Sequence, residues 1–357
     1  MAETPEQTKA AADARARLDS LAKPVGSLGL LEDLVVQLCR AQASYPPILE
    51  SPKVLIFAGD HGVARDEGVS PFPQAVTISM LKTMYAGKSC ATSFSKSNGA
   101  TVDLIDVGVA NEYSLEDTPH DEIVRFFNDR VCEGTDNLAV QPAMSAEQMK
   151  AALQVGRDAV DRAIEEDGTR IFAIGEMGIG NTTPASAIAS RLLGFEDPTR
   201  LVGPGTGLDE KGMQNKSKVI AKALARGGSS PEDALGVLQD LGGLEIAAMT
   251  GAYLQGPERE IALLVDGIIS SSAALVAVRH DPRVASHLIF ATRSSEPGQK
   301  FMLEEVQSIA GATVIPVLDL SLHLGEASGA ALALPILRAG ANLLKDGATL
   351  AEVMAMS

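Results

Sequence analysis

Short apolar runs that end in Gly, Asp or Thr recur along this chain, and each is followed, sooner or later, by a stretch with helical periodicity. Continuous β-branched runs that alternate with helices are typical of strands buried on both faces of a mostly parallel sheet. The sequence therefore predicts an α/β fold in which a mostly parallel sheet is flanked by helices. The predicted strands are residues 53–58, 102–107, 170–174, 261–265, 287–291 and 313–318.

The ends of the predicted strands indicate where a ligand would bind. Parallel sheets of this kind bind ligands outside the carboxyl ends of their strands. We therefore expect the functional site in the loops that follow the strands, which are residues 59–72, 175–183, 266–272, 292–298 and 319–329.

Both ends of the chain are helical in pattern and contain no obvious strand. We expect residues 1–45 and 329–357 to form a small helical domain beside a larger α/β domain of residues 46–328, which carries the ligand-binding loops. Within the larger domain, the polar and acidic segment 110–142 is predicted to be an irregular surface excursion, anchored by two adjacent phenylalanines.

The formal net charge of −16 limits the partners of this chain. A nucleic-acid backbone is held by clustered Lys and Arg, and the sequence has no such cluster, so nucleic acid is not expected as a partner. A small anionic substrate remains compatible with an acidic protein, because helix N-termini and one or two cations can bind a phosphate.

Neither secretion nor a membrane location is indicated by the sequence. The polar N-terminal segment lacks the apolar core of a signal peptide, and no uninterrupted apolar run approaches the roughly 20 residues that span a bilayer. Cys39, Cys90 and Cys132 show no CxxC spacing, so a disulfide scaffold and a structural zinc site are not expected. We therefore expect a cytoplasmic protein without a membrane partner.

A glycine-rich loop with the sequence GEMGIGNTTP occupies residues 175–184, between a predicted strand and a predicted helix. Glycines let the backbone approach a ligand closely, and the amides at a helix start can hold phosphate oxygens. The loop lacks the GxGxxG spacing of a dinucleotide fold and the GK[ST] ending of a P-loop, so we interpret it as a mononucleotide phosphate site. A purely structural turn explains the bare pattern equally well.

Two further segments could contact the same phosphate. The loop GPGTGLD at residues 203–209 precedes a helix that carries Lys216, although an N-capped turn with Lys216 in solvent fits as well. Ser294 and Ser295 follow a predicted strand, where their hydroxyls could meet phosphate or ribose, and helix capping explains them equally. The pattern alone leaves both interpretations open.

Glu326 lies in the segment LHLGEASGA, residues 322–330, between the last predicted strand and an Ala-rich helix. A carboxylate among Leu and Ala at the ligand-binding edge of a sheet could have a raised proton affinity, which suits a general base. The alternative is that Glu326 only stabilises the positive N-terminus of the helix. His323 in this segment, and Asp60 and His61 in the turn AGDHG, could be reactive, but packing and turn formation explain them more simply.

Seven segments together resemble the nicotinate-nucleotide:dimethylbenzimidazole phosphoribosyltransferase family, in order from Leu21 to Leu344. An ordered match over most of the chain is far more specific than any one motif. The segments are KPVGSLGLLE (23–32), FAGDHGV (57–63), EGVSPFPQ (67–74), GEMGIGNTT (175–183), LEIAAMT (244–250), VDGI (265–268) and LGEASGA (324–330).

The resemblance implies a Rossmann-like parallel sheet, a small helical domain made from both ends of the chain, and a homodimer. It also implies an enzyme that uses no metal and no cofactor to transfer the phosphoribosyl group of nicotinate mononucleotide to 5,6-dimethylbenzimidazole. The products are α-ribazole 5′-phosphate and nicotinate, and the reaction serves the assembly of the cobalamin nucleotide loop.

The motifs and the resemblance together imply a set of site residues. Glu326 matches the catalytic glutamate of the family, and Lys216 resembles its phosphate-contacting lysine. Ser70 and Gln74 are expected in the pocket for the base. The segment TRSSE, residues 292–296, departs from the histidine-containing form expected in the family. The expected substrate-binding residues are Ser70, Gln74, Glu176, Gly178, Gly180, Asn181, Thr182, Lys216, Asp266, Ser295 and Leu324.

The expected chemistry agrees with these residues. A nicotinate nucleotide carries a cationic pyridinium leaving group, so only the incoming base has to lose a proton, and Glu326 would take it. Attack on the face opposite the pyridinium would invert the anomeric carbon from β to α. A protein that binds a nucleotide without turning it over is the alternative function, whereas the missing GxGxxG pattern argues against an NAD-dependent oxidoreductase.

Overall fold

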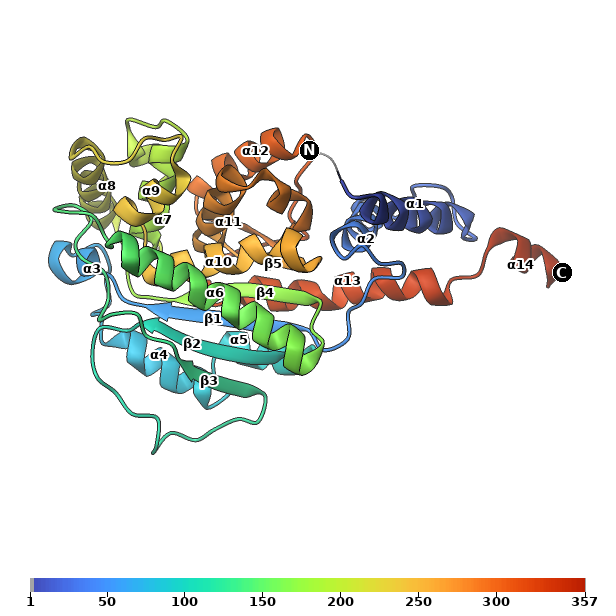
Figure 1. Cartoon of the computed structure of the whole chain (residues 1–357), viewed down its shortest axis with the longest axis horizontal. Helices are drawn as coiled ribbons and strands as arrows, with labels where there is room; N and C mark the ends of the chain where they lie inside the picture. The colour runs from blue at the N-terminus through green and yellow to red at the C-terminus, as the bar shows by residue number, and fades with distance from the viewer. Residues whose placement is uncertain (1–2, 357) are drawn as a thin grey trace.

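The computed structural model describes residues 3–356 and contains a central sheet of six parallel strands in the order β3-β2-β1-β4-β5-β6 (Figure 1). This is the order of doubly wound sheets, in which ligands bind beside the point where the order reverses, here between β1 and β4. The predicted α/β fold with a parallel sheet flanked by helices is therefore confirmed. The strands are β1 (Lys53–Gly59), β2 (Thr101–Gly108), β3 (Val124–Asn128), β4 (Ile171–Met177), β5 (Ala262–Val265) and β6 (Leu288–Phe290).

The inner strands are buried because their side chains enter two apolar layers in turn. In β1, Leu55 and Phe57 pack into the core on one face of the sheet. Val54 and Ile56 pack into the core on the other face. Every residue of β1 is buried, which explains why an inner strand of a parallel sheet has a continuous apolar sequence.

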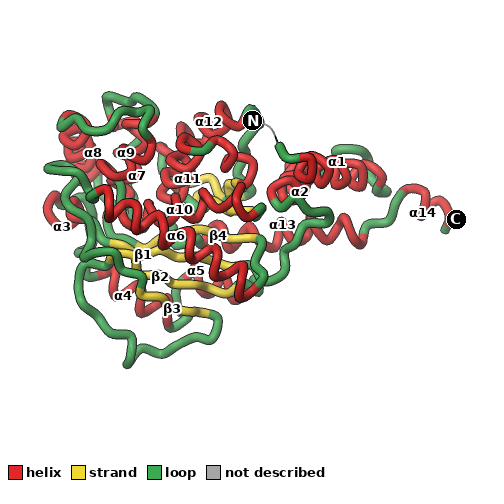
Figure 2. Tube along the Cα trace, in the orientation of Figure 1, coloured by secondary structure: helices red, strands yellow, loops and turns green. Residues whose placement is uncertain are grey.

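Helices cover both faces of the sheet, as Figures 1 and 2 show. α6 illustrates how the sequence delimits them: it begins at a capping box between Ser145 and Gln148 and ends at Gly168, whose φ of 66° suits glycine. None of the described helices is long and apolar enough to cross a membrane. One face packs against α6 (Ala146–Asp167), α7 (Thr182–Leu192), α8 (Glu210–Ala225), α9 (Ala234–Leu241), α10 (Leu244–Arg259), α11 (Ile268–His280) and α12 (Gly298–Ala310), and the other against α4 (Val76–Tyr85), α5 (Cys90–Ser97) and α13 (Ser328–Asp346).

The terminal helices gather at one end of the molecule (Figure 1). They are α1 (Pro5–Ser20), α2 (Leu30–Ala41), the end of α13 and α14 (Leu350–Ala355). α13 contributes Leu334 to the core beneath the sheet and Leu344 to a separate core that also contains Leu18 of α1 and Val35 of α2. The division into two domains at residues 45 and 329 stays a prediction.

Two predictions about strands are wrong. Segment 313–318 adds no strand to the central sheet: β8 (Leu318–Leu322) begins only at its last residue and pairs with β7 (Thr292–Ser294) in a separate two-stranded sheet. Pro316 within that segment has no N–H to donate to a strand ladder. Segment 110–142 is not wholly irregular, because β3 pairs with β2. As an edge strand, β3 is only partly buried and so lacks a continuous apolar run.

Candidate functional site

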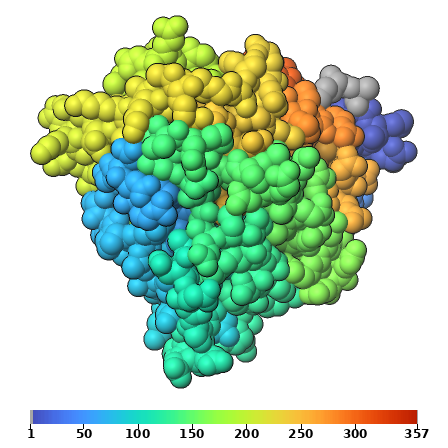
Figure 3. Space-filling view, turned by 60° about the vertical axis from the view of Figure 1, so that its left-hand side comes forward, coloured from blue at the N-terminus to red at the C-terminus, as the bar shows by residue number. Residues whose placement is uncertain are grey.

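A cavity of about 330 Å³ lies at the carboxyl ends of the strands. Each of the five loops in which the sequence predicted the site contributes residues to its lining. Figure 3 brings this end of the molecule forward, and segments coloured blue, green and yellow, which are far apart in the sequence, adjoin on one surface. The cavity lies beside the point where the strand order reverses, as expected for a doubly wound sheet.

Glu326 lies in a strained turn between β8 and α13. Its φ of 64° and the equal φ of Ala327 are left-handed, which costs of the order of 1–3 kcal/mol for each non-glycine residue. The turn approaches β4 so closely that a Cβ on Gly175 would lie 2.2 Å from the Ala327 nitrogen. Only glycine therefore allows this turn to pack against the sheet.

Two buried carboxyls hold this turn in place. Glu176, at the end of β4, accepts a hydrogen bond from the N–H of Glu326 at 3.3 Å and another from the side-chain amide of Asn181. Asp266, which follows β5, accepts from the N–H of Ala330 at 2.9 Å. These bonds help to offset the backbone strain, so residues from two other strands fix the orientation of the turn.

Burial raises the pKa of all three carboxyls. It raises the pKa of Glu326 to about 7 and that of Asp266 to about 7. It raises the pKa of Glu176 to about 8, although the hydrogen bond from Asn181 opposes the shift. Near neutral pH these groups are therefore partly protonated, which reduces the repulsion of an anionic ligand and lets Glu326 exchange a proton.

The glycine loop leads directly into the N-terminus of α7. A Cβ on Gly178 would lie 2.3 Å from the carbonyl oxygen of Gly59, so glycine is required there for the loop to lie against β1. α7 begins at Thr182 without a side-chain cap, and Gly180, Asn181 and Thr182 line the cavity. The positive end of a helix dipole and its amides are thus available to an anion.

Lys216 and Glu296 both bind the loop GPGTGLD, residues 203–209. Lys216 of α8 is fully buried and donates from Nζ to Thr182 Oγ1 at 2.6 Å and to the carbonyl oxygen of Gly203 at 3.4 Å. Glu296 accepts from the N–H of Gly205 at 2.7 Å. Burial lowers the pKa of Lys216 to about 8, and the charge of Glu296 opposes this shift. At pH 7 the charged ammonium group of Lys216 therefore lies directly behind Thr182, which lines the cavity.

Most of the predicted site residues come together at this cavity, but three of them do not line it. Lys216 reaches it through Thr182. Gln74 donates its side-chain amide to the carbonyl oxygen of His61 at 3.3 Å, and Ser295 lines a different pocket on the surface. The predicted residues that line the cavity are Ser70, Glu176, Gly178, Gly180, Asn181, Thr182, Asp266, Leu324 and Glu326.

Sequence reasoning missed Glu296 and, apart from Leu324, the apolar wall of the cavity. No pattern distinguishes the carboxyl of Glu296 from an ordinary helix-capping residue. Val76 and Met80 of α4 look like core residues in the sequence, yet they line the cavity with Phe72 and Leu324 and form a surface suited to an aromatic ring. Within residues 3–356, no group of three or more His, Cys, Asp or Glu side chains could hold a metal ion.

Comparisons with known sequences point to one family. A family model described as phosphoribosyltransferase matches residues 4–354. A relative in Pseudomonas putida strain W619, named nicotinate-nucleotide–dimethylbenzimidazole phosphoribosyltransferase, is 46% identical over 349 residues, which cover 98% of this chain and 95% of the relative. A relative of the same name in Pseudomonas aeruginosa strain LESB58 is 45% identical over 348 residues, which cover 98% of this chain and 94% of the relative.

Solved structures give the same result. The crystal structure of CobT from Thermus thermophilus has a TM-score of 0.87 and 39% sequence identity to this chain, and the match covers 97% of this chain and 98% of that one. A second crystal structure from that organism, named as the nicotinate-nucleotide–dimethylbenzimidazole phosphoribosyltransferase, has a TM-score of 0.85 at 39% identity and the same coverage. The likeness therefore extends over nearly the whole chain.

Proposed function

Because the chain belongs to the nicotinate-nucleotide:dimethylbenzimidazole phosphoribosyltransferase family, we propose that it transfers the phosphoribosyl group of nicotinate mononucleotide to 5,6-dimethylbenzimidazole. The products would be nicotinate and α-ribazole 5′-phosphate, for the nucleotide loop of cobalamin. The observation that carries this proposal is the position of Glu326, a buried carboxyl with a pKa of about 7 on the same cavity as the N-terminus of α7. A helix N-terminus can bind the phosphate of the nucleotide, and a general base can take the proton of the incoming base, so both suit this transfer.

The proposed reaction exchanges one C–N bond for another. The bond between C1′ of the ribose and the pyridinium nitrogen breaks, and its electron pair leaves with nicotinate. One benzimidazole nitrogen forms the new bond to C1′, and Glu326 takes the proton from the other ring nitrogen. The pyridinium is cationic before it departs, so it accepts the electron pair without prior protonation. Attack from the face opposite the leaving group would invert C1′ from β to α.

We assign the two substrates to different parts of the cavity lining. The phosphate and ribose would bind at the glycine loop and the start of α7, because helix amides and the nearby Lys216 favour an anion there. The base would bind against the apolar wall that includes Val76, Met80 and Leu324, with Ser70 as a polar contact. Glu326 lines the same cavity and would meet the base where its ring nitrogen faces C1′.

We also infer a homodimer. α14 extends from the body of the molecule in Figure 1, and its Leu350 and Val353 are 60% and 41% exposed. Exposed apolar side chains on a projecting helix favour a contact with another surface. Sedimentation at several concentrations would test this, and a monomer throughout would exclude the dimer. The cytoplasmic location expected from the sequence stays a prediction, which cell fractionation would test.

The decisive experiment is a transfer assay with the purified protein. Nicotinate mononucleotide and 5,6-dimethylbenzimidazole are mixed with it in the presence of a chelator, and both products are followed by chromatography. We expect nicotinate and α-ribazole 5′-phosphate to form in equal amounts. Success only with another aromatic acceptor would keep the reaction and change the base. No release of nicotinate with any acceptor would overturn the proposal in favour of a nucleotide-binding protein without turnover.

A further inference from the structure

A buried hydroxyl joins the helix that forms the apolar wall of the cavity to the glycine loop. Thr77 of α4 is fully buried, and its Oγ1 accepts a hydrogen bond from the N–H of Ile179 at 3.3 Å. Val76, the neighbour of Thr77, lines the cavity, and so does Ile179. The hydroxyl of Thr77 therefore links the wall assigned to the base with the loop assigned to the nucleotide.

Asp60 fixes the orientation of this hydroxyl. Thr77 donates to Asp60 Oδ1 at 2.7 Å, which leaves the lone pairs of the threonine oxygen for the N–H of Ile179. Asp60 Oδ2 accepts from the N–H of Ala110 at 2.9 Å. The backbone N–H of Asp60 donates to the carbonyl oxygen of Gly108 at 2.9 Å. The carboxylate is thus held beside the end of β2, and through Thr77 it fixes the position of α4 relative to the glycine loop.

His61, the residue next to Asp60, contacts the segment that leads into α4 and lies beside the glycine loop. Gln74, just before α4, donates its side-chain amide to the carbonyl oxygen of His61 at 3.3 Å. The ring of His61 is held by Glu245, with 2.8 Å between Nε2 and Oε1, and both side chains are fully buried. A Cβ on Gly178 would lie 3.4 Å from His61 Nε2, so this ring packs directly against the glycine loop.

We propose that Thr77 and Asp60 are positioning residues that couple the base site to the nucleotide site. The inference rests on the proposed function for the identity of the two ligands. Neither side chain lines the cavity, so both act through α4 and Ile179. When the base binds, it holds α4 in the position that binding requires, and the hydroxyl of Thr77 then holds the glycine loop in place for the nucleotide. The same contact acts in the opposite direction when the nucleotide binds first, so each ligand increases the affinity for the other.

The test measures this coupling with Thr77→Val, which keeps the shape of the side chain and removes the hydroxyl. Both ligands can occupy a Glu326→Gln protein together because transfer is slow there. In that background, saturating 5,6-dimethylbenzimidazole should lower the Kd of nicotinate mononucleotide in calorimetry. The coupling is the factor by which the base lowers the Kd of nicotinate mononucleotide. Thr77→Val should reduce this factor by about two- to tenfold, as the loss of one or two hydrogen bonds predicts. Thr77→Ser should restore it.

Thr83→Val is the matched control, because Thr83 lies in the same helix and donates only to the carbonyl oxygen of Ser79, at 2.8 Å. The inference is overturned if Thr77→Val keeps the full coupling, or if Thr83→Val loses it equally. If Thr77→Val does not fold, Asp60→Asn replaces it with the same expected loss. A Glu326→Gln protein that binds each ligand but lacks coupling refutes this inference alone. If the wild-type protein binds neither ligand, the proposed function fails as well.

Discussion

Burial raises the pKa of Glu326 to about 7, so the proposed base loses its proton near neutral pH. Below that pH the carboxyl is protonated and cannot take the proton of the incoming base. We therefore expect kcat to rise as the pH passes upward through about 7. Glu326→Gln keeps the size of the side chain but removes the base, and should lower kcat by about 100- to 10,000-fold while the nucleotide still binds.

Steady-state kinetics over a pH series measure both effects. Glu304→Gln on the exposed side of α12 is the control and should keep the wild-type profile. A Glu326→Gln protein with an unchanged kcat, or with the same loss of rate in acid, would remove Glu326 from the role of base.

The sequence predicted those cavity residues that lie within a short, recognisable motif. Gly178 and Glu326 lie in short motifs at strand ends, and both line the cavity. Of two adjacent serines, the expected substrate-binding residues included Ser295 and not Ser294. Ser294, the last residue of β7, lines this cavity, whereas Ser295 lies beyond the strand and lines a different pocket. The bond from Gln74 to His61 depends on how a helix start approaches the sheet, which no local pattern encodes.

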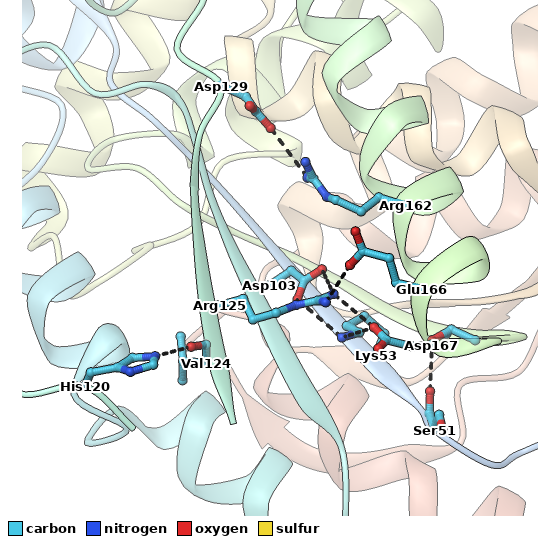
Figure 4. Close-up of polar contacts among 11 residues, drawn as sticks. Ser51, Lys53, Asp103, His120, Val124, Arg125, Asp129, Arg162, Glu166 and Asp167 are labelled. Carbon is cyan, nitrogen blue, oxygen red and sulfur yellow. Dashed lines mark hydrogen bonds and ion pairs between the residues drawn. The ribbon is translucent and has the colours of Figure 1, made fainter. Parts of the chain in front are cut away.

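At the level of elements, a charged network joins three strands to α6 (Figure 4). It lies near the amino ends of the strands, whereas the cavity lies at their carboxyl ends. Asp103 of β2 is fully buried and lies 3.3 Å from Lys53 Nζ of β1 and 2.9 Å from Arg125 Nε of β3. Asp167, in the last turn of α6, lies 2.8 Å from Lys53 and 2.9 Å from Arg125. The network therefore fixes the C-terminal end of α6 to the amino-terminal ends of β1, β2 and β3.

Asp103→Asn is expected to lower the free energy of unfolding by about 3–5 kcal/mol, because it removes one partner from a buried set of charges. Glu166→Gln is the control: it removes a carboxylate 2.8 Å from Arg125 that is 54% exposed, and should cost only about 0–1 kcal/mol. Urea unfolding measures both. The KM of each substrate should stay unchanged, since the cavity is at the other end. Equal losses of unfolding free energy in the two variants would show that the buried Asp103 contributes no more than the exposed Glu166.

The inner strands could be predicted because burial on both faces demands an uninterrupted apolar run. β3 escaped prediction because an edge strand meets no such demand, and its surroundings are polar. β8 was placed too early because the apolar run before it suggests a strand, whereas Pro316 prevents a regular ladder there. Strand pairing at an edge depends on distant partners, and a single sequence does not contain that information.

At the scale of the whole molecule, His287 connects α1 to the α/β body. Its Nε2 lies 3.3 Å from Nε2 of Gln7 in α1, and its Nδ1 lies 3.0 Å from the carbonyl oxygen of Ile261. A ring that donates at Nδ1 and accepts at Nε2 is neutral. Burial lowers the pKa of His287, and the hydrogen bond to the Ile261 backbone opposes this shift.

This contact should make stability depend on pH. Between the lowered folded pKa and the unfolded value of about 6.5, the unfolded state binds more protons at this ring, so stability is lost as the pH falls below about 6.5. His287→Asn should therefore lose less Tm than the wild-type protein between about pH 7.5 and about pH 5.5. His280→Asn, at an exposed histidine ending α11, should behave like the wild-type protein. Identical pH profiles for His287→Asn and the wild-type protein would contradict the proposed titration.

The path of α13 has a consequence for the order in which the molecule is completed during translation. Leu18 and Val35 belong to helices that are synthesised long before α13, yet α13 supplies Leu344 to the same core. Until α13 emerges, a nascent chain exposes these apolar faces, which makes α1 and α2 natural targets for chaperones. Only Ala327 separates Glu326 from the start of α13. The terminal core and the segment that carries the proposed base are therefore completed at the same stage of synthesis.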